Sequence, residues 1–154
     1  MSQPQPPASE RQQQHNTYLS GYGQRATNHH EWRNASNSAP HLLLTLIHLA
    51  TLNPQTLNPQ LTLLDVGAGS GTITASLASY MPQGKVIATD LSQEILQKAK
   101  TYANDMGAGN VEVQQANCYE LPFEDGIFDV VHTSMMLTHL DDPKKAVKEM
   151  IRVA

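Results

Sequence analysis

The sequence passes from an apolar run into a glycine-rich turn at Leu63-Leu64-Asp65-Val66-Gly67-Ala68-Gly69-Ser70-Gly71-Thr72. An apolar run of this length that ends in glycines is typical of a buried strand followed by a tight turn and a helix. Glycine lets the backbone adopt positive φ and lets a ligand approach closely, and the first turn of the helix presents unpaired N–H groups. The stretch therefore predicts a nucleotide-binding turn after this strand.

The spacing of the glycines indicates which nucleotide binds. A dinucleotide site reads G-x-G-x-x-G around a pyrophosphate, whereas Gly67, Gly69 and Gly71 follow the pattern G-x-G-x-G. Asp65, at the end of the strand, would repel a pyrophosphate but suits a ligand that carries an ammonium group. S-adenosylmethionine is such a ligand, because its methionine part has an amino group and the molecule contains no phosphate.

A second carboxylate follows at the distance that a ribose contact requires. The segment Val86-Ile87-Ala88-Thr89-Asp90 predicts a short buried strand with Asp90 at its carboxyl end, roughly 20 residues beyond the turn. A carboxylate there accepts hydrogen bonds from ribose hydroxyls. Both NAD and S-adenosylmethionine need that contact, so Asp90 indicates a nucleotide site, and Asp65 with the glycine spacing selects the second ligand.

The chain alternates between predicted strands and helices. Strands are expected at 61–66, 85–89, 111–115 and 127–132, and helices at 42–52, 72–80, 92–106 and 143–153. Alternation of this kind predicts an α/β fold with a doubly wound, Rossmann-like parallel sheet. Ligands bind at the carboxyl ends of such strands, which is where Gly67, Asp90, Asn117 and Ser134 fall.

Several ordered blocks carry a family resemblance. The chain resembles the class I S-adenosylmethionine-dependent methyltransferases, and within them the ubiquinone/menaquinone biosynthesis C-methyltransferase group, from about Tyr18 to its end. The blocks that carry this resemblance are Leu64-Asp65-Val66-Gly67-Ala68-Gly69-Ser70-Gly71, Ala88-Thr89-Asp90-Leu91-Ser92, Asn117-Cys118-Tyr119-Glu120-Leu121-Pro122-Phe123, Phe128-Asp129-Val130-Val131-His132 and Leu137-Thr138-His139-Leu140-Asp141-Asp142-Pro143.

The resemblance implies methyl transfer from S-adenosylmethionine to a small molecule, and it implies a set of cofactor-binding residues. The third block lies beside the adenine in the family, usually with Asp where this chain has Asn117, whose amide oxygen is still an acceptor. Arg33 is implied at the methionine carboxylate and Tyr22 in a lid, although a solvated arginine and a packing tyrosine are the open alternative. The other implied cofactor-binding residues are Asp65, Gly67, Ala68, Gly69, Gly71, Asp90, Leu91, Cys118 and Ser134.

No catalytic side chain can be demanded from the sequence, because methyl transfer from a sulfonium depends mainly on alignment of donor and acceptor and exclusion of water. His139 is the candidate base, with a packed histidine as the alternative, and His132 is interpreted as structural. The adjacent pair His29-His30 has no further partner at metal-ligand spacing, so no metal is expected.

Length and composition set the remaining expectations. The 154 residues, 40% of them hydrophobic, fit one domain, and a net charge of −4 disfavours nucleic acid as a partner. A single cysteine, Cys118, suits a reducing compartment and hence the cytoplasm. The most apolar segment, 42–52, is shorter than the ~20 residues of a membrane span. We expect a Gln/Pro-rich flexible tail at 1–16, a helical lid and loop at 17–60, and the cofactor-binding core at 61–154.

The resemblance also predicts an incomplete sheet. The family's strand order is 3-2-1-4-5-7-6, and the chain stops at Ala154, so the order 3-2-1-4 is expected, with the fourth strand as an edge. An uncovered apolar edge invites self-association. Three interpretations follow: a methyltransferase or a truncated form of one, a non-catalytic fragment that binds cofactor or a partner, and, with least support from the glycine spacing, an NAD-dependent oxidoreductase.

Overall fold

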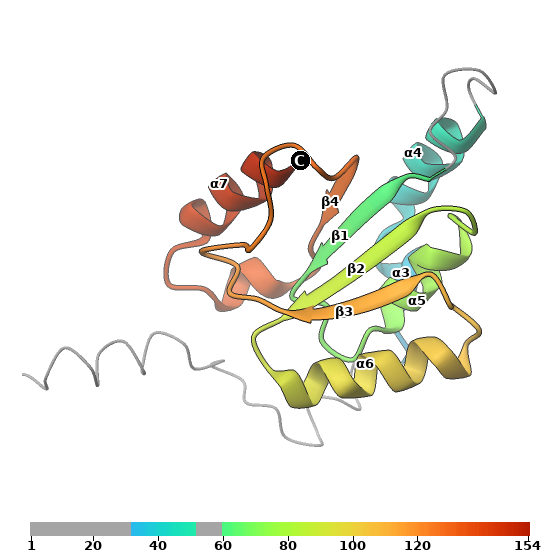
Figure 1. The fold of residues 1–154 in the computed structure, drawn as a ribbon, viewed down its shortest axis with the longest axis horizontal. Helices are drawn as coiled ribbons and strands as arrows, with labels where there is room; N and C mark the ends of the chain where they lie inside the picture. Colours follow the sequence, from blue (N-terminus) through green and yellow to red (C-terminus); the bar gives the residue numbers. More distant parts are fainter. Residues whose placement is uncertain (1–31, 52–59) are drawn as a thin grey trace, which may run out of the picture.

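A computed structural model describes residues 32–51 and 60–154 of the chain. Its centre is a four-stranded parallel sheet in the order β3-β2-β1-β4 (Figure 1). The predicted Rossmann-like parallel sheet and its strand order are therefore confirmed. The strands are β1 (Thr62–Val66), β2 (Lys85–Asp90), β3 (Val111–Gln115) and β4 (Val130–His132), and the helices are α3 (Ala35–Ser38), α4 (Pro40–Thr51), α5 (Thr72–Ser79), α6 (Gln93–Asp105), the 3-10 helix η1 (Met136–His139) and α7 (Pro143–Val153).

Helices cover both faces of the sheet because neighbouring residues of each strand point to opposite sides. In β1, the Leu63 side chain packs on one face with α3, α4, α5 and α6, and the Leu64 side chain packs on the other face with α7. Both leucines are fully buried. A strand that is apolar on both faces is typical of a parallel sheet enclosed by helices, which explains the continuous apolar run in the sequence.

The helix ends follow the general rules of helix capping. The Ser92 hydroxyl accepts the backbone N–H of Ile95 at 3.3 Å, and Gly107 follows α6 with a φ of 71°. At α7, the Asp142 carboxylate accepts the N–H of Lys145 at 3.0 Å, and Pro143 occupies the first turn. The helix and strand ends otherwise lie within two residues of their expected positions, apart from the fourth strand.

The fourth strand is shorter than predicted. It was expected at 127–132, but β4 spans only Val130–His132. The Phe128 N–H donates to the carbonyl of Val153 at the end of α7, and the Asp129 carboxylate accepts the N–H of Thr62. These contacts take the backbone of 127–129 away from the sheet ladder. The short elements α3 and η1 were not predicted, since neither has a full turn of apolar periodicity.

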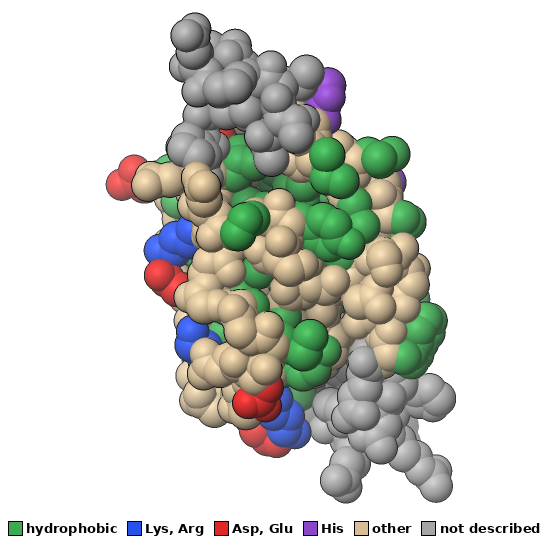
Figure 2. Space-filling model, turned by 90° about the vertical axis from the view of Figure 1, so that its right-hand side faces the viewer, with side chains coloured by type: hydrophobic (Ala, Val, Ile, Leu, Met, Phe, Trp, Pro, Cys, Tyr) green, Lys and Arg blue, Asp and Glu red, His purple; other side chains and the backbone are tan. Residues whose placement is uncertain are grey.

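The outer side of α4 is apolar and exposed. Leu42 and Leu46 of this helix face the core, whereas Leu44 and Ile47 are exposed. Figure 2 shows hydrophobic side chains interspersed among other atoms on the face that it draws, with charged side chains along its left and lower margins. The predicted tail at 1–16 and Tyr22 lie outside the described residues. Within 32–51 and 60–154, no helix has the length and apolar character needed to cross a bilayer.

Replacement of Gly71 by alanine is expected to lower the free energy of unfolding by about 2–4 kcal/mol. Gly71 has a φ of 76°, and a Cβ atom there would lie 2.7 Å from the Ala99 Cβ and 3.0 Å from the Ala99 Cα on α6. Gly69→Ala is the matched control, because its φ is also positive but nothing lies within 4 Å of the added carbon. Urea unfolding of both variants measures the difference, and equal losses would contradict a packing role for Gly71.

Candidate functional site

The glycine turn sits at the carboxyl edge of the sheet and is fixed there by backbone hydrogen bonds. The N–H groups of Gly67 and Ala68 both donate to the carbonyl of Thr89 on β2, at 2.8 and 2.9 Å. Gly71 then caps α5, so the turn leads from the end of β1 directly to the amino end of a helix. Such an end carries unpaired N–H groups and a partial positive charge, which suit the polar part of a ligand.

Asp90 ends β2 beside this turn, as predicted. One carboxylate oxygen accepts the Gly69 N–H at 3.1 Å, and the other accepts the Ser92 N–H at 3.0 Å. The two contacts fix the orientation of the carboxylate between the glycine turn and the start of α6. Each oxygen of a carboxylate can accept more than one hydrogen bond.

The segment after β3 forms the next part of the same edge. Asn117 Oδ1 accepts the Tyr119 N–H at 3.0 Å, which folds the loop and leaves one further lone pair on the amide oxygen. The Leu91 carbonyl accepts from the Gln115 side chain at 2.7 Å. Burial, the largest cause, raises the pKa of the Cys118 thiol, so this residue is a poor nucleophile at neutral pH.

The segment after β4 meets the N-terminal part of the chain. The Arg33 guanidinium donates to the Ser134 hydroxyl at 2.6 Å, although 101 residues separate them in sequence. Thr133 donates to the carbonyl of Val66 at 2.7 Å, which ties the end of β4 to the end of β1. The structure thus brings Arg33 and Ser134, both predicted cofactor-binding residues, together at one end of the sheet.

Asp65 lies beneath the turn rather than in the open. Its exposed fraction is 2%. One carboxylate oxygen accepts from the Thr74 hydroxyl at 2.6 Å, and the other lies 3.0 Å from His132 Nδ1. The Thr74 and His132 side chains are themselves buried, so the Asp65 carboxylate is held between α5 and β4. Its contact with a ligand ammonium stays a prediction.

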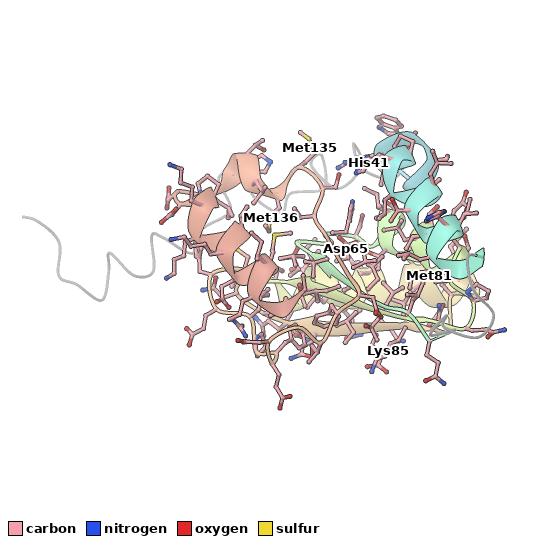
Figure 3. The ribbon with its side chains drawn as sticks, turned by 90° about the horizontal axis from the view of Figure 1, so that it is seen from above. His41, Asp65, Met81, Lys85, Met135 and Met136 are labelled. Atoms are coloured by element: carbon pink, nitrogen blue, oxygen red, sulfur yellow. The ribbon has the colours of Figure 1, made fainter. Side chains whose placement is uncertain are left out.

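Met136 is a site residue that sequence reasoning missed. A Cβ atom on Gly67 would lie 2.7 Å from the Met136 sulfur, so this side chain packs directly on the first glycine of the turn. Figure 3 shows Met136 turned inward beneath η1 and α7, while its neighbour Met135 points outward. Met135 has a φ of 65°, a strained value for a residue with a side chain. No sequence signal separates these two methionines from ordinary core residues.

The structure leaves two predicted assignments open. His139 ends η1 and is half-buried, so its role as a base stays a prediction. The assignment of Tyr22 to a lid falls outside the described residues. Among residues 32–51 and 60–154, no group of three His, Cys, Asp or Glu side chains is placed to hold a metal ion.

A charged network fastens the segment after Asn117 to α7. The Arg152 guanidinium donates to the carbonyls of Leu121 and Phe123, at 2.9 and 2.8 Å, and to the carboxylates of Glu149 and Asp125. Glu149 in turn accepts the Leu121 N–H at 3.0 Å. Both polar groups of the Leu121 backbone are therefore held by α7, which positions the loop on the adenine side of the predicted site.

This network is expected to fail in acid. Hydrogen bonds from Arg152, the largest cause, and from the Leu121 backbone hold the pKa of Glu149 below its ordinary value of 4.5. A lowered folded-state pKa gives stability that is present above the unfolded value and is lost as the pH falls through the folded value. Below about pH 4.5, the melting temperature should therefore fall less steeply with decreasing pH in Glu149→Gln than in the unmodified chain. Parallel acid profiles for the two proteins would contradict this.

Comparison with known sequences identifies the family. A family described as methyltransferase domain matches residues 63–154. An uncharacterised methyltransferase of Schizosaccharomyces pombe is 40% identical over 97 residues, which are 59% of this chain and 35% of that protein. The ubiquinone/menaquinone biosynthesis C-methyltransferase UbiE of Vibrio campbellii is 40% identical over 92 residues, 58% of this chain and 36% of that protein. The chain thus spans about a third of the length of these curated relatives.

Solved structures agree with the sequence match. The YcgJ protein of Bacillus subtilis aligns with a TM-score of 0.59 and 30% identity, covering 74% of this chain and 46% of that one. A SAM-dependent methyltransferase from Aquifex aeolicus aligns with a TM-score of 0.61 and 28% identity, covering 78% and 60%. Because the family match extends over more than half of its residues, this chain belongs to the methyltransferase domain family.

Proposed function

We propose that this chain binds S-adenosylmethionine at the carboxyl edge of its sheet and uses it as a methyl donor toward a small molecule. The observation that carries the proposal is Asp90, fixed between the N–H groups of Gly69 and Ser92 beside the glycine turn. A carboxylate oriented in this way accepts hydrogen bonds from the two hydroxyls of a ribose. Membership of the methyltransferase domain family supports the same cofactor.

The strand order β3-β2-β1-β4 supports a direction for the proposed cofactor. The ribose contact lies at the end of β2, and the loop of Asn117 after β3 supplies the adenine side. The methionine part would then extend across the glycine turn toward β4, where Arg33 meets Ser134. In this arrangement Arg33 lies on the side of the methionine carboxylate, and the transferable methyl group lies between β1 and β4.

The acceptor is proposed to be a small molecule in the cytoplasm. The similar protein of Vibrio campbellii is named a ubiquinone/menaquinone biosynthesis C-methyltransferase, which supports a small organic acceptor for this chain. The net charge of −4 disfavours a nucleic acid substrate, and the single cysteine favours a reducing compartment.

A second candidate is a chain that binds cofactor or a partner without catalysis. Within the described residues, β4 pairs with β1 on one side only. An edge strand of this kind pairs readily with another chain, so we expect self-association that increases with protein concentration. Sedimentation velocity over a range of concentrations tests this expectation. A monomer at every concentration would remove the support for a self-associating form.

Calorimetric titration with S-adenosylhomocysteine tests the proposed cofactor. This product of methyl transfer keeps the adenosine, the amino group and the carboxylate but has no methyl group to donate. We expect micromolar affinity for it and no measurable binding of NAD, because the turn lacks the pyrophosphate spacing. Circular dichroism of the same sample establishes that the chain is folded. A folded chain that binds NAD in preference, or neither ligand, would refute the proposal.

A further inference from the structure

A buried carboxylate and imidazole form a pair next to the proposed cofactor site. Asp65 on β1 and His132 on β4 are register partners in adjacent strands. Asp65 Oδ1 lies 3.0 Å from His132 Nδ1, and Thr74 donates to the other carboxylate oxygen. A carboxylate oxygen accepts but does not donate, so the proton of the neutral imidazole resides on Nδ1. The second ring nitrogen, Nε2, then carries a free lone pair.

The Nε2 atom of His132 is the part of the ring that reaches solvent. The one hydrogen bond of the His132 side chain within the described residues is made by Nδ1. Across residues 32–51 and 60–154, no fully buried side-chain nitrogen or oxygen lacks a partner. Nε2 therefore contacts solvent, although the residue as a whole is only 7% exposed.

The pair lies where the transferable methyl group is expected. Asp65 precedes Gly67 by two residues, which is roughly 7 Å along a strand, and His132 is the last residue of β4. The next two residues of the chain lead to Ser134 and its contact with Arg33. Adenine and ribose are assigned to β3 and β2, so the sulfonium end of the ligand falls at β1 and β4, beside His132.

We propose that His132, oriented by Asp65, is the general base that takes a proton from the methyl acceptor. The inference rests on the proposed function, because it needs the sulfonium cofactor. As the acceptor atom loses its proton to Nε2, its electron pair forms the bond to the methyl carbon. The carbon–sulfur bond breaks, and its electrons remain on sulfur as a neutral thioether. The imidazolium, stabilised by Asp65, later gives its proton to water.

Two ligands that differ in charge test where Nε2 lies. S-adenosylmethionine carries a positive sulfonium, and S-adenosylhomocysteine carries a neutral sulfur at the same place. A permanent positive charge at residue 132 repels only the first, so the ratio of the dissociation constants, S-adenosylmethionine over S-adenosylhomocysteine, should be at least about fivefold higher in His132→Arg than in the unmodified chain at the same pH. Asp65 contacts the ring, and Thr74 on α5, which shares that carboxylate, is uncharged.

Variants separate the proposed role of His132 as a base from its structural role. In His132→Asn, the amide N–H can still donate to Asp65, but the side chain offers no basic nitrogen, so both ligands should still bind. His48→Arg is the matched control for the added charge, because His48 is exposed on the outer side of α4, and this variant should leave the ratio unchanged. For any acceptor that the unmodified chain methylates, His132→Asn should lower the single-turnover rate at least about 100-fold.

The outcomes distinguish this inference from the function on which it rests. A ratio that rises in His132→Arg but not in His48→Arg supports the base. If both ligands bind to His132→Arg with an unchanged ratio, or if His132→Asn keeps the full methyl-transfer rate, the base is overturned while the proposed function stands. A folded chain that binds neither ligand overturns both.

Discussion

Asp65→Ala is expected to lower the free energy of unfolding by about 3–5 kcal/mol, a large part of the roughly 5–15 kcal/mol typical of a domain. The substitution leaves His132 Nδ1 and the Thr74 hydroxyl without their common acceptor in a layer where all three side chains are buried. A buried polar group without a partner loses its hydration and gains no compensating hydrogen bond. Urea unfolding monitored by circular dichroism measures the loss.

Two further variants give this result its meaning. Glu112→Ala removes the same charge from the neighbouring part of the sheet, where Glu112 forms an exposed ion pair with Lys85, and should cost less than about 1 kcal/mol. Asp65→Asn keeps the shape and one acceptor oxygen, so its loss should be intermediate. If Asp65→Ala were as mild as Glu112→Ala, the buried contacts of Asp65 would contribute little to stability.

The part of the site that is local in sequence could be predicted from sequence. Gly67, Gly69 and Gly71 are spaced within one turn, and Asp90 follows at a characteristic distance after a strand whose apolar pattern is clear. Strand and helix alternation then fixed the parallel sheet, because right-handed crossovers leave few alternatives. The structure confirms this sheet and its order.

The part that depends on register could not be predicted in this way. Asp65 and His132 are 67 residues apart, and their contact depends on the register between β1 and β4. A shift of one residue in that register would turn one of the two side chains to the other face of the sheet and abolish the contact. His132 was therefore interpreted as a structural residue of a strand. The contact of Met136 with Gly67 and the hydrogen bond from Arg33 to Ser134 have the same origin, since each joins loops that only the folded sheet brings together.

Asp90→Ala is expected to weaken binding of S-adenosylhomocysteine at least about 100-fold. The variant removes a charged acceptor for two ribose hydroxyls, and hydrogen bonds to a charged group contribute about 1.5–3 kcal/mol each. It also releases the N–H of Gly69, which the carboxylate holds at 3.1 Å, so the turn loses a restraint as well. Calorimetric titration of the folded variant gives the affinity directly.

The conservative substitution and an exposed control separate the ribose contact from a loss of fold. Asp90→Asn keeps one acceptor oxygen and should bind S-adenosylhomocysteine about tenfold more weakly than the unmodified chain does. Its affinity should therefore lie between those of the unmodified chain and Asp90→Ala. Asp105→Ala removes an exposed carboxylate at the end of α6 and should leave the affinity unchanged. Asp90 also orients the start of α6 through its contact with Ser92, so its loss should disturb any ligand bound at the end of β2. A ligand that bound with equal affinity to Asp90→Ala and to the unmodified chain would have to bind elsewhere.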